Sequence, residues 1–115
     1  MKKSELRGET RLRTSLKAEL SSGGHWFSCR ILDMSDTGFS IICNKQLAPG
    51  QVLDFRCELY PGKFLDCKIE IKHVDDTCAG TKIVEISKKG ASLCQLFLQE
   101  KYFDRQNKHE NYEGR

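Results

Sequence analysis

Two groups of polar residues have the types and the spacing to bind an anionic nucleotide. Arg7 and Arg11 form an R-x-x-x-R pattern, and residues 33–38 follow the pattern D-x-S-x-x-G. Arginine presents a planar fork of donors that suits phosphate oxygens and also the O6/N7 edge of guanine. Two arginines on one short segment could therefore grip an anionic guanine nucleotide.

The second group is chemically complementary to the arginines. Asp33 can accept hydrogen bonds from N1–H and N2–H₂ of guanine, or it can orient an arginine. Ser35 can donate to a phosphate or hold the loop, and Gly38 allows a positive φ or a close backbone approach. A guanine-containing diphosphate would satisfy all of these groups together.

Each group also has a structural interpretation that needs no ligand. Asp33 and Ser35 could form a turn between two strands, in which Gly38 supplies backbone freedom. Arg7 and Arg11 could be solvated residues of a chain terminus. The two patterns nevertheless occur in order, and each lies beside a predicted strand, which favours a shared binding role.

Other kinds of reactive site lack support in the sequence. No histidine stands near a nucleophile motif, and G-x-S-x-G, a Gly-rich phosphate loop, H-E-x-x-H and EF-hand spacing are all absent. We therefore expect no enzymatic activity, no catalytic residue and no cofactor. The six cysteines are at least ten residues apart, so they form no C-x-x-C knuckle, and we expect no metal site. Most of them alternate with apolar residues, which predicts buried free thiols.

The chain around these groups alternates between apolar and polar residues, a pattern typical of half-buried strands. Clusters of turn residues, most of them containing Gly or Pro, separate the alternating segments. The predicted strands are residues 12–20, 25–32, 39–43, 53–59, 65–72 and 82–86.

The apolar period changes after the sixth predicted strand. From Lys88 onward the apolar residues recur at helical spacing, and Ser87 is a suitable N-cap for the predicted helix. Residues 105–115 have no apolar period, and we expect them to form a disordered tail. The predicted apolar face of the helix consists of Leu93, Leu96, Phe97 and Phe103.

These elements predict the fold class. Six short strands and one terminal helix indicate an all-β domain, a small antiparallel barrel with a C-terminal helix. OB-like and SH3-like barrels share this pattern. Lys and Arg outnumber Asp and Glu six to two in residues 1–17 and do not outnumber them elsewhere. We therefore expect a flexible basic arm over residues 1–10, the barrel and helix over 11–104, and the tail beyond.

The R-x-x-x-R and D-x-S-x-x-G patterns, with the strands beside them, resemble the signature of PilZ domains, bacterial receptors for cyclic di-GMP. The resemblance covers residues 5–103, including Gly80 before the sixth predicted strand. It implies a six-stranded antiparallel β-barrel with a C-terminal helix. It also implies that Arg7 and Arg11 clasp phosphates and guanine edges as the arm closes over the ligand. The remaining residues implied to line the site are Asp33, Ser35 and Gly38.

The chain departs from the family pattern at Leu6, where many members have a further arginine. This departure leaves the number of bound nucleotides open. Arg13, on the outer face of the first predicted strand, could contact a phosphate or be a solvated residue. Leu6 and Arg13 are therefore secondary candidates for the site.

Two other side chains have more than one interpretation. Trp26 could stack on guanine, or it could pack beneath the terminal helix from the outer face of the second strand. His73 continues the inner face of the fifth strand, which favours a packed or rim position over a catalytic base.

Two other functions are compatible with the same features. A PilZ-like protein-interaction module without a ligand would use the fold alone. A small nucleic-acid-binding barrel would need basic and aromatic residues along one face, and here the body is near-neutral. No apolar run suggests a membrane span or a secretory signal, so we expect a cytoplasmic receptor with a downstream protein partner and no membrane insertion.

Overall fold

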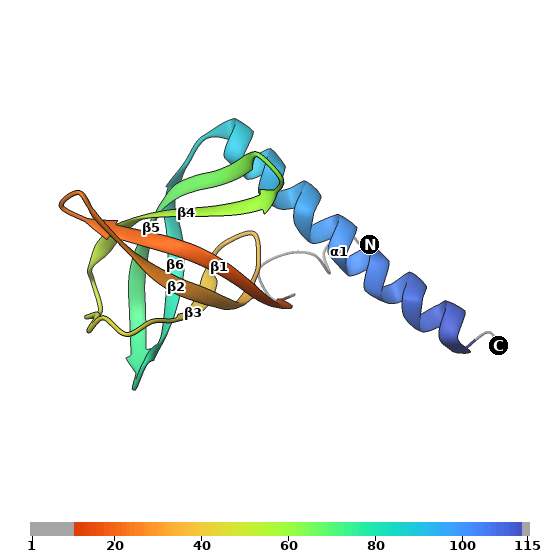
Figure 1. Ribbon diagram of the computed structural model, residues 1–115, viewed down its shortest axis with the longest axis horizontal. Helices are drawn as coiled ribbons and strands as arrows, with labels where there is room; N and C mark the ends of the chain where they lie inside the picture. The colour runs from red at the N-terminus through yellow and green to blue at the C-terminus, as the bar shows by residue number, and fades with distance from the viewer. Residues whose placement is uncertain (1–10, 114–115) are drawn as a thin grey trace.

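The chain folds into a closed antiparallel β-barrel with one helix at its C-terminal end (Figure 1). The computed structural model describes the backbone of residues 11–113 and the side chains of residues 11–104. Around the barrel the strands follow the order β1-β2-β3-β6-β5-β4. The elements are β1 (Leu12–Ser22), β2 (His25–Met34), β3 (Phe39–Ile42), β4 (Val52–Tyr60), β5 (Lys63–Asp75), β6 (Cys78–Ile86) and α1 (Lys88–Glu113). The predicted fold class, a six-stranded antiparallel barrel with a terminal helix, is confirmed.

The core follows from the alternation of apolar residues along the strands. Inward-facing side chains of all six strands fill the barrel, and Phe39 and Phe55 stack at its centre with their ring centroids 4.4 Å apart. Closure of the sheet between β1 and β4 leaves few unpaired strand edges. The barrel is therefore a rigid support for residues on its outer surface.

Irregularities in the strands change which residues face outward. Pairing slips by one residue between Arg13 and Leu16 in β1, and between Ile31 and Asp33 in β2. Each such bulge reverses the inward and outward alternation of the residues beyond it. β2 continues to Met34, although the sequence predicted a loop from residue 33, and the reversed alternation beyond the bulge buries the Met34 side chain.

The helix begins with the predicted cap. Ser87 Oγ accepts a hydrogen bond from Gly90 N at 2.9 Å, and Ala91 N donates to Ser87 O. The predicted apolar face is partly wrong, because Leu96 and Phe103 are 47% and 62% exposed. The side chains of α1 that are buried against the barrel are Cys94, Phe97 and Leu98.

The helix is longer than the sequence predicted. It continues to Glu113, so the prediction of a disordered tail over residues 105–115 is wrong for the backbone up to that residue. The reason is that no Gly or Pro interrupts residues 91–113, and an amphipathic pattern is not required where a helix projects into solvent. Figure 1 shows this half of α1 extending away from the barrel. Within the described residues, α1 is not apolar enough over a sufficient length to cross a membrane.

Replacement of Ser87 by alanine is expected to lower the free energy of unfolding by about 1 kcal/mol, because the first turn of α1 loses its side-chain acceptor. Urea unfolding monitored by circular dichroism measures this difference. Ser92→Ala is the matched control, since Ser92 is exposed on the same helix. An equal effect of both variants would contradict the capping role.

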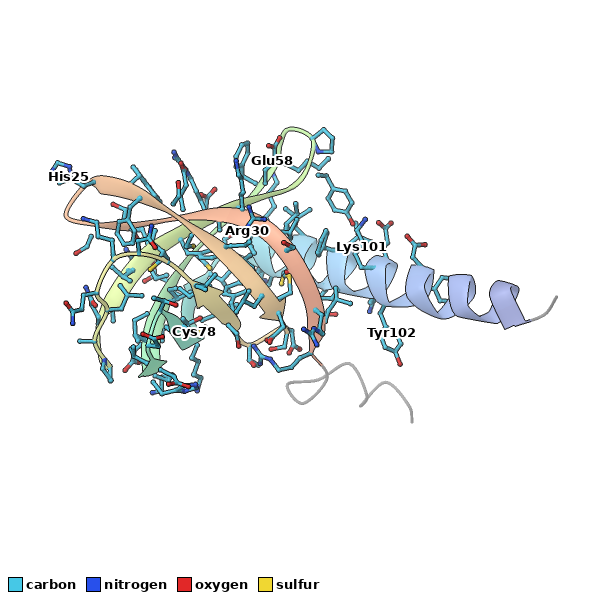
Figure 2. All side chains as sticks on the ribbon, turned by 60° about the horizontal axis from the view of Figure 1, so that its bottom comes forward. His25, Arg30, Glu58, Cys78, Lys101 and Tyr102 are labelled. Carbon is cyan, nitrogen blue, oxygen red and sulfur yellow. The ribbon has the colours of Figure 1, made fainter. Side chains whose placement is uncertain are left out.

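The predicted burial of the cysteines is confirmed for five of the six, and all six are free thiols. Burial raises the pKa of Cys29 and of Cys67 from 9.0 to about 12. Cys78 alone is not fully buried. Figure 2 shows it on β6.

This difference predicts the order in which the thiols react. At about pH 8 an alkylating reagent should label Cys78 first, because the thiolate is the nucleophile and Cys29 and Cys67 stay protonated. The pKa of Cys29 is 9.0 in the unfolded chain and about 12 in the folded one, so above pH 9.0 the unfolded chain loses a thiol proton that the folded chain retains. The free energy of unfolding should therefore fall as the pH rises from 9.0 to about 12. Mass spectrometry of the native protein after limited alkylation tests the order. Equal labelling of Cys29 and Cys78 would contradict it.

Candidate functional site

The loop between β2 and β3 is organised around Ser35, whose side chain is fully buried. Ser35 N donates to Gly38 O at 2.9 Å, which closes the loop. Ser35 Oγ accepts from Thr37 N at 3.2 Å and lies 3.1 Å from Thr37 Oγ1. Ser35 could donate to a phosphate or hold the loop, and these contacts support the second role.

Gly38 fixes the loop against β6. A Cβ atom at this position would lie 2.1 Å from Thr81 O and 3.1 Å from Lys82 Cα. The neighbouring backbone is tied to the same strand, because Ile83 N donates to Thr37 O at 2.7 Å. Gly38 does not adopt a left-handed φ. The structure therefore explains this glycine by close backbone approach.

Arg11 reaches the loop from the residue before β1. Its Nε donates to Asp33 Oδ1 at 2.6 Å, and its Nη1 lies 3.4 Å from Ser35 Oγ. The pairing of Leu12 with Met34 places Arg11 beside the start of the loop. The bulge in β2 turns Asp33 outward, so its carboxylate can meet the guanidinium on the barrel surface.

The predicted site residues therefore converge only in part within the described chain. Arg11, Asp33, Ser35 and Gly38 come together at one place on the barrel. The secondary candidate Arg13 is exposed on β1 and pairs in register with Asp33. The other two predicted positions, Arg7 and Leu6, lie outside the described residues.

A pocket of about 360 Å³ lies beside the Arg11 guanidinium. It contains two residues that the sequence did not single out as binding residues, Lys72 and His73. Arg11 and Lys72 are its two cationic side chains, and Lys72 Nζ also lies 3.6 Å from Glu70 Oε2. Guanidinium and ammonium groups suit an anionic ligand. The pocket is lined by Arg11, Phe39, Ser40, Lys72, His73, Gly80 and Thr81.

His73 and Gly80 form one side of this pocket. They pair in register across β5 and β6, and a Cβ at Gly80 would lie 2.2 Å from His73 Cε1. The ring therefore rests over the glycine backbone. Pairing slips between Ile71 and His73, which moves His73 off the predicted inner face and leaves its side chain exposed at the rim. The bulge gave no signal in the sequence, because it depends on pairing with β6.

Trp26 lies away from this site. It is next to His25, which Figure 2 shows at the tip of the β1–β2 hairpin, at the opposite end of β1 from Arg11. The guanidinium of Arg56 lies 4.2 Å from the Trp26 ring centroid. The predicted packing beneath the terminal helix is therefore wrong, since β4 supplies the cover and α1 does not. Among the described residues no group of three His, Cys, Asp or Glu side chains could hold a metal ion.

Comparison with known proteins identifies the family. The family model described as the PilZ domain matches residues 5–100. The chain belongs to the PilZ domain family. PilZ domains are receptor and adaptor modules that generally bind cyclic di-GMP. A search of curated proteins finds no match for this PilZ domain.

Solved structures share the fold of this PilZ domain at low sequence identity. The inhibitor of motility MotI/DgrA of Bacillus subtilis superposes with a TM-score of 0.72 at 9% identity, over 82% of this chain and 50% of that one. The present chain thus spans half the length of MotI/DgrA. The PilZ domain of CeSA from a cellulose-synthesizing bacterium gives a TM-score of 0.60 at 13% identity, over 84% of this chain and 97% of that domain. An uncharacterized Legionella protein gives a TM-score of 0.51 at 18% identity, over 85% of this chain and 97% of that one.

Proposed function

We propose that this PilZ domain is a cyclic di-GMP receptor without catalytic activity. The observation that carries the proposal is the Arg11 guanidinium, which Asp33 and Ser35 hold at the edge of a basic pocket. Membership of a family that generally binds this dinucleotide supports the same ligand.

In this proposal Asp33 and Ser35 act by orienting Arg11. The carboxylate engages Nε and Ser35 Oγ engages Nη1, and the N–H donors that these two contacts leave over are available for a phosphate or for the O6/N7 edge of guanine. Pre-orientation reduces the conformational entropy that the side chain loses on binding. Lys72 supplies a second cation for a phosphate, and the exposed ring of His73 offers a flat surface to a base.

The signalling step in this proposal is closure of the N-terminal segment. Arg7 would grip the ligand from the side opposite to Arg11 and draw residues 1–10 onto the barrel. Such closure creates a new surface for a downstream protein, a population shift driven by the ligand. Arg11 is already held on the barrel by Asp33, so in this proposal the ligand is what joins Arg7 to the same site.

An NMR titration with cyclic di-GMP tests the location of the site. We expect the amide signals of Thr37, Gly38 and Gly80 to move, and those of Leu96 and Phe103 on α1 to stay in place. In the same experiment, relaxation of the amides of residues 1–10 should report slower motion with ligand than without it. Shifts confined to α1, or no shifts at saturating ligand, would contradict the proposed site.

A further inference from the structure

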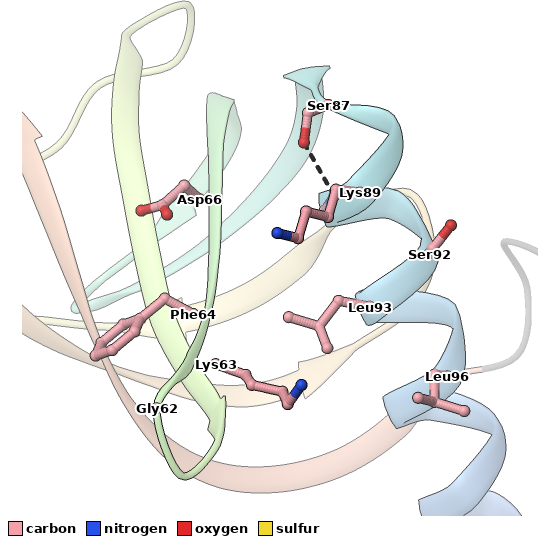
Figure 3. Close-up of a pocket in the computed structure, with 10 residues that line it drawn as sticks. Gly62, Lys63, Phe64, Asp66, Ser87, Lys89, Ser92, Leu93 and Leu96 are labelled. Carbon is pink, nitrogen blue, oxygen red and sulfur yellow. Dashed lines mark hydrogen bonds between the residues drawn. The ribbon is translucent and has the colours of Figure 1, made fainter.

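A second concave surface lies between the start of β5 and the start of α1, and it shares no lining residue with the pocket beside Arg11. Its volume, about 600 Å³, is within the range of ligand-binding pockets. Figure 3 shows Lys63 of β5 and Lys89 and Leu93 of α1 pointing into this space. We call it the β5–α1 groove. Nothing in the proposed cyclic di-GMP site uses it.

One wall of the β5–α1 groove is an open strand edge. The pairing of β5 with β6 begins at Cys67 opposite Ile86, where β6 ends and the chain turns into α1. Residues Lys63–Asp66 therefore have a strand neighbour only on the β4 side within the described chain. Because successive residues of a strand direct their N–H and C=O groups to opposite sides, two of these four present theirs to the groove. Such an edge is a template for another strand.

The opposite wall is partly apolar. Leu93 is half-buried at the barrel end, and Leu96 is 47% exposed on the same helix. An extended peptide that paired with β5 would place every second side chain toward these leucines, while the side chains between them faced solvent. The leucine wall therefore favours apolar residues at alternate positions of the peptide.

The charge of the groove favours an acidic occupant. Lys63 and Lys89 point into it, whereas Figure 3 shows Asp66, the acidic residue in its lining, pointing to the far side of β5. The first turn of α1 also contains no acidic residue to match the positive end of the helix dipole. Carboxylates at the ends of the peptide would be attracted by both lysines and by this helix end.

We propose that the β5–α1 groove binds an extended segment of a partner protein that adds a strand to the open edge of β5, with alternating apolar residues against α1 and acidic residues at its ends. Main-chain hydrogen bonds to β5 supply affinity in this mode, and the leucines and lysines supply selectivity. The groove lies where α1 meets the barrel, which makes it an output surface separate from the nucleotide site.

The first test is a selection from a displayed library of random peptides, performed on the full chain without nucleotide. We expect enriched sequences with alternating apolar residues and terminal Asp or Glu. On a variant with both Lys63→Glu and Lys89→Glu these sequences should disappear, and peptides with Lys or Arg ends should replace them. Lys17→Glu with Lys82→Glu is the matched control, because it makes the same change of net charge at exposed residues outside the groove and should keep the original selection. The absence of any enriched sequence, or equal selection by all three proteins, would overturn the proposal.

The second test distinguishes strand addition from side-chain contact alone. One enriched peptide is made in two forms, N-methylated at alternate amides, so that one form loses the donors that face β5 and the other loses the donors that face away. We expect one form to bind about tenfold more weakly than the other, since each lost hydrogen bond costs roughly 1 kcal/mol before compensation, and a tenfold change is ~1.4 kcal/mol. The amide signals of Lys63–Asp66 should move with the form that binds. Equal affinity of the two forms, dimerisation of the chain in place of peptide binding, or shifts located away from β5 would overturn the proposal.

Discussion

Arg11→Ala is expected to weaken the binding of cyclic di-GMP about ten- to a hundredfold, which corresponds to ~1–3 kcal/mol for one lost bidentate contact. The variant removes the guanidinium that Asp33 and Ser35 hold in place. The fold should remain, because the Arg11–Asp33 pair is partly exposed, at 37% and 28%, and ion pairs of this kind contribute about 1 kcal/mol or less. The dissociation constant should therefore rise, while the melting temperature should change little.

Lys17→Ala is the matched control for this experiment. It removes one positive charge from the exposed face of β1, the strand that follows Arg11, at a position farther from the loop. If the effect of Arg11 came from general attraction between a basic surface and an anion, both variants would weaken binding alike. Equal losses in the two variants, or no loss in Arg11→Ala, would contradict the role assigned to Arg11.

Gly38→Ala is expected to lower the free energy of unfolding by about 3 kcal/mol and to impair binding as a consequence. The new Cβ would lie 2.1 Å from Thr81 O and 3.0 Å from Thr81 C, and both are backbone atoms of β6. A backbone cannot move aside as a side chain can, so the loop must separate from β6. That separation would lengthen the hydrogen bond from Ile83 N to Thr37 O and disturb the orientation of Ser35.

Gly80→Ala provides the comparison. Its Cβ would also meet atoms at less than 3.0 Å, but all three belong to the ring of His73, which is exposed and can rotate away. We expect a smaller loss in the free energy of unfolding than for Gly38→Ala, less than about 1 kcal/mol after the difference in β-propensity between Gly and Ala is subtracted. The His73 ring should also change its position in the pocket beside Arg11. Urea unfolding of both variants measures the contrast. A larger loss in Gly80→Ala than in Gly38→Ala would contradict this account of the loop.

The strands were predictable because their signal is local. Alternation at period two gave all six strands, and the turn residues between them separated one strand from the next. The helix cap at Ser87 was predictable for the same reason. The buried face of α1 was not predictable, because the barrel end that it covers exists only after the sheet has closed. Leu96 and Phe103 turn away from this end of the barrel. Residues beyond 104 show that a helix can continue without a core-facing stripe.

The site was predictable where its residues form short patterns. The association of Arg11 with the loop at Asp33 follows from spacing and family resemblance together. Lys72 and His73 were missed because they reach the pocket through the pairing of β5 with β6 and β6 with β3, far from the motifs in sequence. Bulges in β2 and β5 turn the side chains of Asp33 and His73 to the outer surface. A bulge depends on the partner strand as much as on its own residues, so these orientations could not be predicted from the sequence.

The most direct test of the central claim is isothermal titration of the full chain with cyclic di-GMP at physiological salt, with GTP and the linear GpG dinucleotide as controls. We expect selective binding with a dissociation constant of about 1 μM or lower, and the stoichiometry will show how many nucleotides bind where Leu6 replaces a family arginine. Absence of heat from cyclic di-GMP with folded protein, or equal binding of the linear dinucleotide, would contradict the receptor function and leave a ligand-free interaction module.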